Sequence, residues 1–111
     1  MNNVRRNNPG YDVKATRRET GSPITENRYI EVKGRISGST TVTVSRNEIL
    51  TSLNDPQNWL LALVEVKPGG GEDVRYVKAP FQGSDSNFLF GVTSVSYDWA
   101  PLWERGTPTH D

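Results

Sequence analysis

The sequence of 111 residues contains no cysteine and a single histidine. Without cysteine, the chain has neither a disulfide framework nor a thiolate metal site. The histidine, His110, is the penultimate residue of a polar tail, where a solvated side chain is the usual state. No stretch approaches the roughly 18 apolar residues of a membrane helix, and no signal segment opens the chain. We therefore expect a soluble, cytoplasmic protein without a membrane partner.

Apolar residues are also scarce. They make up 33% of the chain, which contains ten glycines and seven prolines. A chain of this length forms one domain with a modest core. We therefore expect a single, loop-rich domain over residues 1–111.

Neither sign of charge is in excess over the whole chain, but the charges are unevenly distributed. The 13 Lys and Arg residues balance the 13 acidic residues, yet residues 1–35 carry eight of the basic residues and four of the acidic ones. A positively charged first third of the chain favours a polyanion as partner. The alternative, that these residues only keep loops soluble, is supported about equally well by charge alone.

The stretch Arg28–Gly34 is the most informative part of the chain, because polar and apolar residues alternate in it as they do in a β-strand. Glu31 and Lys33 share one face of this strand, which we expect to face solvent. Ile30 and Val32 share the other face, which we expect to face the core. A carboxylate and an ammonium group held side by side form either a catalytic site or an ordinary surface ion pair.

A second strand is predicted over residues 11–16, where apolar and polar side chains alternate. The turn-rich residues 17–27 follow it, so a hairpin with the strand over 29–33 is the simplest connection. In such a hairpin, Asp12 and Lys14 share the face of the Glu-x-Lys pair if the register allows it.

Further elements follow from the pattern of the middle of the chain. Ser45 and Glu48 match a capping box that begins a helix over 46–53. The β-branched strand 40–44 before the helix and the apolar strand 59–66 after it are expected to form a right-handed βαβ unit. The remaining predicted strands cover residues 74–78 and 91–99.

From residue 79 onward the chain is rich in aromatic side chains but has little regular pattern. This segment holds six of the ten aromatic residues: Phe81, Phe88, Phe90, Tyr97, Trp99 and Trp103. Such residues are more often core than ligand contacts, so we expect residues 81–111 to form an extension that packs back over the sheet. A platform for base stacking is the alternative.

Several of these motifs occur in an order that belongs to a known family. They are Pro9-Gly10-Tyr11-Asp12-Val13, Tyr29-Ile30-Glu31-Val32-Lys33-Gly34, Val44-Ser45-Arg46-Asn47-Glu48 and the apolar strand from Trp59. Together they resemble the domain at the C-terminus of the plant NO VEIN protein, which is appended to many bacterial helicase-like and defence-associated proteins. That domain is similar in turn to the restriction-endonuclease-like superfamily, named for its PD-(D/E)xK motif.

The resemblance implies an α/β (α+β) fold: a mixed central sheet of about five strands with a βαβ unit and a core over about residues 9–80. A restriction-endonuclease-like core usually begins with a helix before its first strand. Only eleven residues precede Asp12, and they are too polar and turn-rich for a helix. The resemblance therefore implies a core that lacks its N-terminal helix.

The resemblance also implies a set of site residues. By position, Asp12 corresponds to the first acid of the motif, Glu31 to its second acid and Lys33 to its lysine, so these three residues are the implied catalytic set. The carboxylates of Asp12 and Glu31, with the Val32 carbonyl, are hard oxygen ligands of the kind that Mg²⁺ (or Mn²⁺) takes. Asn47 and Glu48 are expected to cap the helix and not to belong to the site.

The implied partner is a nucleic acid, with DNA favoured, and the implied setting is a helicase-like protein to which the domain is fused or bound. Whether the chain forms a homodimer is left open. Basic residues on and near the predicted hairpin are expected to contact the nucleic acid: Lys14, Arg17, Arg18 and Arg35.

Three functions compete. The first is metal-dependent phosphodiester hydrolysis of DNA by a module of a larger nucleic-acid-processing or defence protein. The second is a module that binds nucleic acid or positions a helicase partner without cleaving. The third is a protein-interaction domain whose aromatic tail docks a neighbour. The presence of Asp12, Glu31 and Lys33 together favours the first two.

Overall fold

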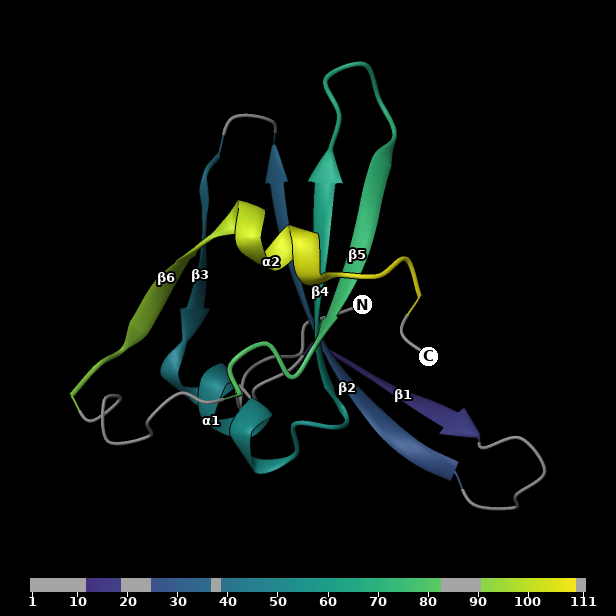
Figure 1. The fold of residues 1–111 in the computed structure, drawn as a ribbon, viewed down its shortest axis with the longest axis vertical. Coiled ribbons are helices and arrows are strands. Elements are labelled where there is room, and N and C mark those ends of the chain that lie inside the picture. The colour runs from purple at the N-terminus through teal and green to yellow at the C-terminus, as the bar shows by residue number, and fades with distance from the viewer. Residues whose placement is uncertain (1–11, 19–24, 37–38, 83–90, 110–111) are drawn as a thin grey trace.

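The computed structural model describes residues 12–18, 25–36, 39–82 and 91–109. The residues before Asp12, on which the prediction of a missing helix rests, lie outside this part, as do Phe88 and Phe90. The elements in chain order are β1 (Val13–Arg18), β2 (Thr25–Ile36), β3 (Thr41–Ser45), α1 (Arg46–Asn54), β4 (Trp59–Val66), β5 (Glu72–Lys78), β6 (Ser94–Asp98) and α2 (Trp99–Arg105) (Figure 1).

The fold is α+β and contains two sheets. Four strands form a mixed sheet in the order β1-β2-β4-β5, and β3 pairs with β6 in a separate two-stranded sheet. β2 and β4 are parallel, whereas β1 with β2 and β4 with β5 are antiparallel. The chain passes through β3 and α1 between the two parallel strands, because parallel neighbours require a crossover connection.

The prediction of one sheet of about five strands, with the strand before α1 paired to β4, is wrong. β3 pairs antiparallel with β6. The cause lies in its side chains, because Val42 and Val44 are buried while Thr41 and Thr43, which alternate with them, are exposed, so β3 has only one apolar face. β4 is buried on both faces over its first five residues and lies in the middle of the larger sheet.

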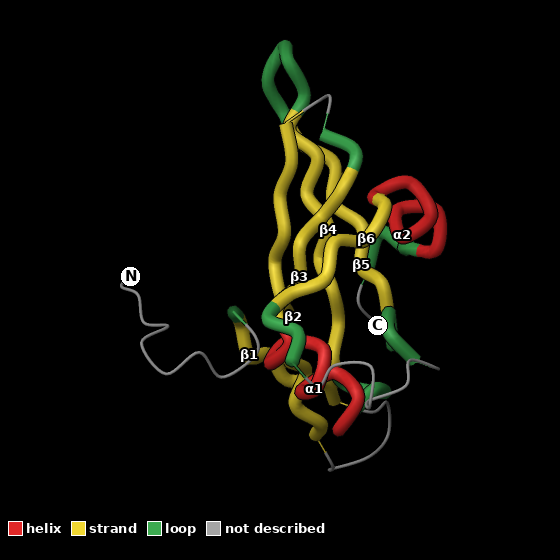
Figure 2. The backbone as a smooth tube through the Cα atoms, turned by 90° about the vertical axis from the view of Figure 1, so that its left-hand side faces the viewer, coloured by secondary structure: helices red, strands yellow, loops and turns green. Residues whose placement is uncertain are grey.

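Both helices and the β3–β6 pair pack on one face of the four-stranded sheet. Figure 2 shows α2 on this side of the sheet, and none of the described helices lies on the other side. Their buried apolar residues form the main core: Val42, Val44, Ile49, Trp59, Leu61, Leu63, Val77, Phe81, Trp99 and Leu102.

Helix α2 was not predicted; the last predicted strand is β6, which ends where the helix begins. Two stacks of an arginine on a tryptophan join α2 to the sheet. Arg35 Cζ lies 4.5 Å from the centroid of the Trp99 ring, and Arg75 Cζ lies 4.6 Å from that of Trp103. Trp99 is 1% exposed and Phe81 is 2% exposed, so these two aromatic side chains belong to the core.

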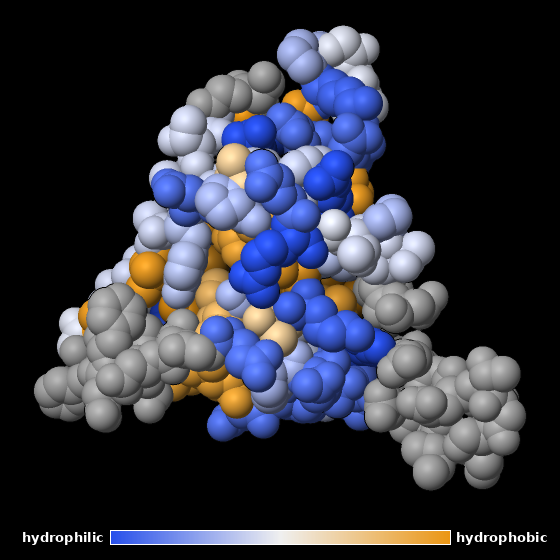
Figure 3. Space-filling model, in the orientation of Figure 1, coloured by the Kyte–Doolittle hydropathy of each residue, from blue (hydrophilic) through white to orange (hydrophobic). Residues whose placement is uncertain are grey.

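The opposite face of the sheet is less completely covered. It carries a small cluster of Ile30, Leu60 and Ala62, against which Tyr76 packs. Further apolar side chains of the sheet are exposed: Val13, Val32, Ile36 and Val66. In contrast, the side of the molecule that carries α2 is mostly hydrophilic, with smaller apolar areas between the polar side chains (Figure 3).

Strand β2 is longer than predicted and reaches beyond the sheet. Only its part from Tyr29 onward pairs with β4, whereas Thr25–Arg28 pair with β1 alone. These residues and their partners 15–18 form a two-stranded hairpin arm that extends from the body of the molecule (Figure 1). The arm leads directly into the stretch of β2 that carries Glu31 and Lys33.

Candidate functional site

Glu31 and Lys33 lie on the face of β2 that packs against the helices, so the prediction that they face solvent is wrong. The side chain of Glu31 is 2% exposed and that of Lys33 is 22% exposed. Val32, predicted to face the core, is 42% exposed. The cause is the parallel pairing with β4, because the residues opposite the charged pair, Leu61 and Leu63, belong to the main core.

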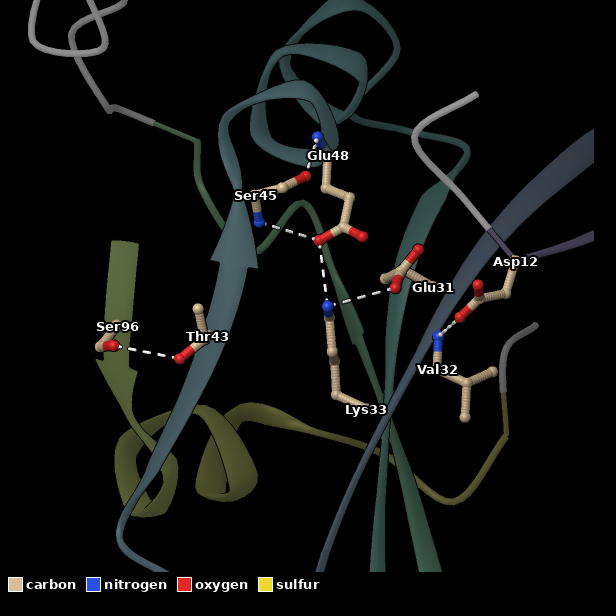
Figure 4. A network of polar contacts seen from close by, with 8 residues as sticks. All are labelled: Asp12, Glu31, Val32, Lys33, Thr43, Ser45, Glu48 and Ser96. Carbon is tan, nitrogen blue, oxygen red and sulfur yellow. Dashed lines mark hydrogen bonds and ion pairs between the residues drawn. The ribbon is translucent and has the colours of Figure 1, made fainter. Parts of the chain in front are cut away.

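The Lys33 ammonium group lies between two carboxylates. Its Nζ is 3.3 Å from Glu31 Oε2 and 3.1 Å from Glu48 Oε1 (Figure 4). Glu31 and Glu48 are each 2% exposed, so both carboxylates are largely removed from water. A buried carboxylate is tolerated only when it is paired and hydrogen-bonded. We call Glu31, Lys33 and Glu48 the Glu–Lys–Glu cluster.

Helix α1 brings Glu48 into this cluster through its capping box. The Glu48 backbone N–H donates to Ser45 Oγ at 3.1 Å, and the Ser45 backbone N–H donates to Glu48 Oε1 at 3.0 Å. The predicted capping box is therefore confirmed. Glu48 Oε1 also forms an ion pair with the Lys33 ammonium group. This pair was not expected from the sequence, because helix capping alone explains a glutamate at this position.

The pKa of Glu48 lies below its ordinary value. Burial raises this pKa, but three other effects together outweigh it: the hydrogen bond from the Ser45 backbone, the hydrogen bond with Glu31, and the hydrogen bond and positive charge of Lys33. Glu48 is consequently ionised at neutral pH, as a counter-ion of Lys33 must be.

Asp12 lies directly before β1 and binds the backbone of β2. Its N–H donates to the Ile30 carbonyl oxygen at 2.9 Å, and the Val32 N–H donates to Asp12 Oδ2 at 2.9 Å (Figure 4). The N–H and C=O of one strand residue point to the same neighbouring strand. The Val32 carbonyl therefore faces the side of β2 on which Asp12 lies, and the hairpin brings these groups to the stretch that also carries Glu31.

The oxygen atoms of Asp12, Glu31 and the Val32 carbonyl are donors of the type that a hard cation takes. They are too few for a metal ion that is bound by protein ligands alone. Carboxylate and carbonyl oxygens are the ligands that Mg²⁺ takes, and it completes its shell with water. Among the described residues, no group of three or more His, Cys, Asp and Glu side chains is placed to hold a metal ion. In the described part of the chain, Asp12, Glu31 and the Val32 carbonyl therefore supply oxygen donors of the right type beside β2, but no complete metal-binding group.

The residues predicted to contact nucleic acid do not form one group. Lys14 is exposed on β1, with its Nζ 5.9 Å from the centroid of the Tyr29 ring. Arg17 and Arg18 lie in the hairpin arm by their backbone, and their side chains are outside the described part. The arm is therefore the place where the predicted basic residues concentrate.

Arg35 makes several contacts within the fold. Its Nη2 donates to Glu65 Oε2 at 3.0 Å, its Nη1 donates to the Ser39 carbonyl oxygen, and its guanidinium group stacks on Trp99. These contacts join β2 to β4 and α2, so the guanidinium group is committed to the fold.

Arg28, at the base of the hairpin arm, is an unexpected buried cation. It is 0% exposed, and within the described part of the chain none of its three guanidinium nitrogens makes a hydrogen bond. Burial of an unpaired charge is costly. Nothing in the local sequence of β2 indicated that the Arg28 side chain is buried.

The described elements thus define an α+β domain with a charged site on its β1–β2 hairpin. The family model described as "Protein NO VEIN, C-terminal" matches residues 1–77, and the chain belongs to this family. No curated protein and no solved structure gives a significant match to the chain. Among the described helices, none has the length and apolar character needed to cross a membrane.

Proposed function

We propose that this chain is a restriction-endonuclease-like domain that hydrolyses phosphodiester bonds of DNA with a bound Mg²⁺ or Mn²⁺. One observation carries the proposal. The Asp12 carboxylate accepts the Val32 N–H, so it lies beside β2 at the residue between Glu31 and Lys33, which form an ion pair with each other. The order of these residues, on a hairpin followed by a crossover to a parallel strand, supports the same assignment. The domain would act as a module of a larger nucleic-acid-processing or defence protein.

The proposed roles follow from the position of each group. Asp12 and Glu31, with the Val32 carbonyl, would hold the cation. A metal ion bound there would supply Lewis-acid chemistry, since it polarises a phosphoryl oxygen and lowers the pKa of water. Lys33 would orient the attacking water and offset negative charge that develops on the phosphoryl oxygens. Its side chain is 22% exposed, so Lys33 is not completely enclosed in the core.

DNA would reach this site along the hairpin arm. Arg17 and Arg18 lie in the arm, and Lys14 is exposed near its base. Basic side chains of this kind bind phosphates without regard to sequence, and their contribution weakens as salt increases. The arm is therefore proposed to give the domain its affinity for nucleic acid. Asp12, Glu31 and Lys33 are proposed to carry out the hydrolysis.

A second candidate is a nucleic-acid-binding module without cleavage activity, associated with a helicase-type protein. The observation that favours it is the Glu–Lys–Glu cluster itself. Lys33 is already neutralised by two carboxylates, and within the described part of the chain no group of three or more acidic, His or Cys side chains is placed to hold a metal.

The experiment that separates the two candidates is a cleavage assay on plasmid and single-stranded DNA with Mg²⁺ or Mn²⁺. The parent chain is compared with Glu31→Gln and Lys33→Met, and with Lys67→Met as a matched control, because Lys67 forms a surface ion pair with Asp73. We expect the parent and the control to cleave and the two site variants to be roughly 100-fold slower. Equal background in all four proteins, with salt-sensitive binding, overturns the nuclease assignment in favour of the binding module.

A further inference from the structure

We infer that Glu48 is a positioning residue that holds the Lys33 ammonium group in place from helix α1. The inference rests on the proposed function, since it concerns the lysine of the same site. It gives a second role to the glutamate of the Ser45–Glu48 capping box.

The geometry makes Glu48 a full partner of Lys33. The distance from Lys33 Nζ to Glu48 Oε1 is 3.1 Å, against 3.3 Å to Glu31 Oε2. The two carboxylates come from different elements, one from β2 and one from the first turn of α1, and Lys33 extends between them (Figure 4). A lysine side chain has four rotatable bonds, so a single partner two residues away on its own strand defines its position less well than two partners on separate elements.

Capping alone does not require a carboxylate at this position. Glutamine serves the same position of a capping box, because its side-chain oxygen also accepts the backbone N–H. A buried carboxylate is far more costly than a buried amide unless a cation lies beside it, and Glu48 is 2% exposed. The charge of Glu48 is therefore explained by Lys33, whereas its hydrogen bonds to Ser45 are explained by the cap.

The second partner matters most when the first one is engaged elsewhere. In the proposed function Glu31 binds a cation, and that cation competes with Lys33 for the same carboxylate. Glu48 can keep the lysine in place during this exchange, since its carboxylate lies beside that of Glu31 and contacts the same ammonium group from a different element (Figure 4). The backbone N–H of Ser45 holds Glu48 Oε1 in turn, which ties the position of Lys33 to the rigid start of α1.

Two substitutions separate this role from capping. Glu48→Gln keeps both capping hydrogen bonds and removes the charge. Ser45→Ala removes the hydroxyl acceptor of the cap and leaves the Glu48 carboxylate and the Ser45-position backbone N–H in place. If Glu48→Gln does not fold, Glu48→Asp provides the comparison, because it keeps the charge but withdraws it from Lys33 by one methylene.

The test has one readout that needs no enzyme activity and one that does. The first is the rate at which Lys33 is acylated in the full chain, followed by peptide mass spectrometry with Lys67 as internal reference. We expect Glu48→Gln to raise the Lys33 rate about tenfold, which corresponds to ~1.4 kcal/mol of lost ion pairing, and Ser45→Ala to leave it unchanged. The second is DNA cleavage, where we expect Glu48→Gln to lower kcat about 100-fold with little change in KM.

The outcomes are distinguishable. An unchanged Lys33 acylation rate in Glu48→Gln overturns the inference, whether or not the parent chain cleaves DNA. Equal effects of Glu48→Gln and Ser45→Ala on both readouts also overturn it, because they leave Glu48 a cap alone. A raised acylation rate in a chain that never cleaves DNA supports the positioning of Lys33 and rejects the nuclease proposal instead.

Discussion

Replacement of Lys33 by methionine should destabilise the fold and change the way its stability depends on pH. The substitution keeps the apolar stem of the side chain and removes a cation that forms ion pairs with both Glu31 and Glu48. Two carboxylates that are each 2% exposed are then left side by side.

The expected loss at neutral pH is large for a single substitution. Removal of one partner from a buried ion pair costs about 3–5 kcal/mol, and the 22% exposure of Lys33 places this case at the lower end. A loss of about 3 kcal/mol lowers the Tm of a domain of roughly 100 residues by about 12 °C. Thermal and urea unfolding followed by circular dichroism measure both quantities.

The pH dependence identifies the cause. In the parent chain the pKa of Glu48 lies below its ordinary value, so its contribution to stability is present above the unfolded pKa of about 4.3 and is lost as the pH falls through the lower folded pKa. Without Lys33, two buried carboxylates in contact cannot both stay ionised at little cost, so the folded pair binds a proton at a higher pH than the unfolded chain does. The variant therefore gains stability relative to the parent as the pH falls from 7 to 5.

Lys67→Met is the control, because Lys67 pairs with Asp73 at 3.3 Å on the surface, where both side chains are more than 50% exposed. Such a pair contributes about 0–1 kcal/mol. A Lys33→Met variant no less stable than this control at pH 7, or a stability difference from the parent that widens toward pH 5, refutes the description of Lys33 as the counter-ion of two buried carboxylates.

Three further substitutions test separate parts of the structure. Arg28→Met should leave the free energy of unfolding unchanged or raise it by about 1–4 kcal/mol. The reason is that an apolar side chain replaces a buried cation that makes no hydrogen bond within the described part. A lower free energy of unfolding, measured with urea, shows that Arg28 has an anionic partner. Asp12→Asn keeps an acceptor for the Val32 N–H, so we expect stability within about 0.5 kcal/mol of the parent and cleavage roughly 100-fold slower; parent-like cleavage removes Asp12 from the site. Gly106→Ala places a Cβ 2.7 Å from Arg75 Cβ and should cost about 1–3 kcal/mol; an unchanged urea midpoint contradicts the close approach of α2 to β5.

Local pattern was sufficient to predict most of the elements. The strand Trp59–Val66 has the predicted bounds, and helix α1 begins at the predicted capping box. The pairing of the strands was harder to predict, because it depends on contacts between residues that lie far apart in the sequence. Nothing near β3 indicates that β6, some fifty residues later, is its neighbour. Helix α2 was missed because it is held mainly by tryptophan contacts with the sheet, including the stacks of Arg35 and Arg75.

The sequence order singles out the residues of the proposed site but not their surroundings. Asp12, Glu31 and Lys33 are recognisable from their order along the chain, and the hairpin brings Asp12 to β2. Alternation also predicted correctly that Glu31 and Lys33 share a face. It could not predict that this face is the one covered by α1, because that follows from the parallel pairing of β2 with β4. The same pairing makes Glu48 a neighbour of Lys33 although 15 positions separate them in the sequence.

Calorimetric titration of the chain with Mg²⁺ and Mn²⁺, beside Glu31→Gln and Lys67→Met, measures directly whether β2 carries a metal site. We expect one cation per chain for the parent and for the Lys67 control, and no binding by Glu31→Gln, because Glu31 is a proposed ligand. Absence of binding by the parent, or equal binding by the parent and Glu31→Gln, contradicts the assignment of β2 as the metal-binding strand of a nuclease site.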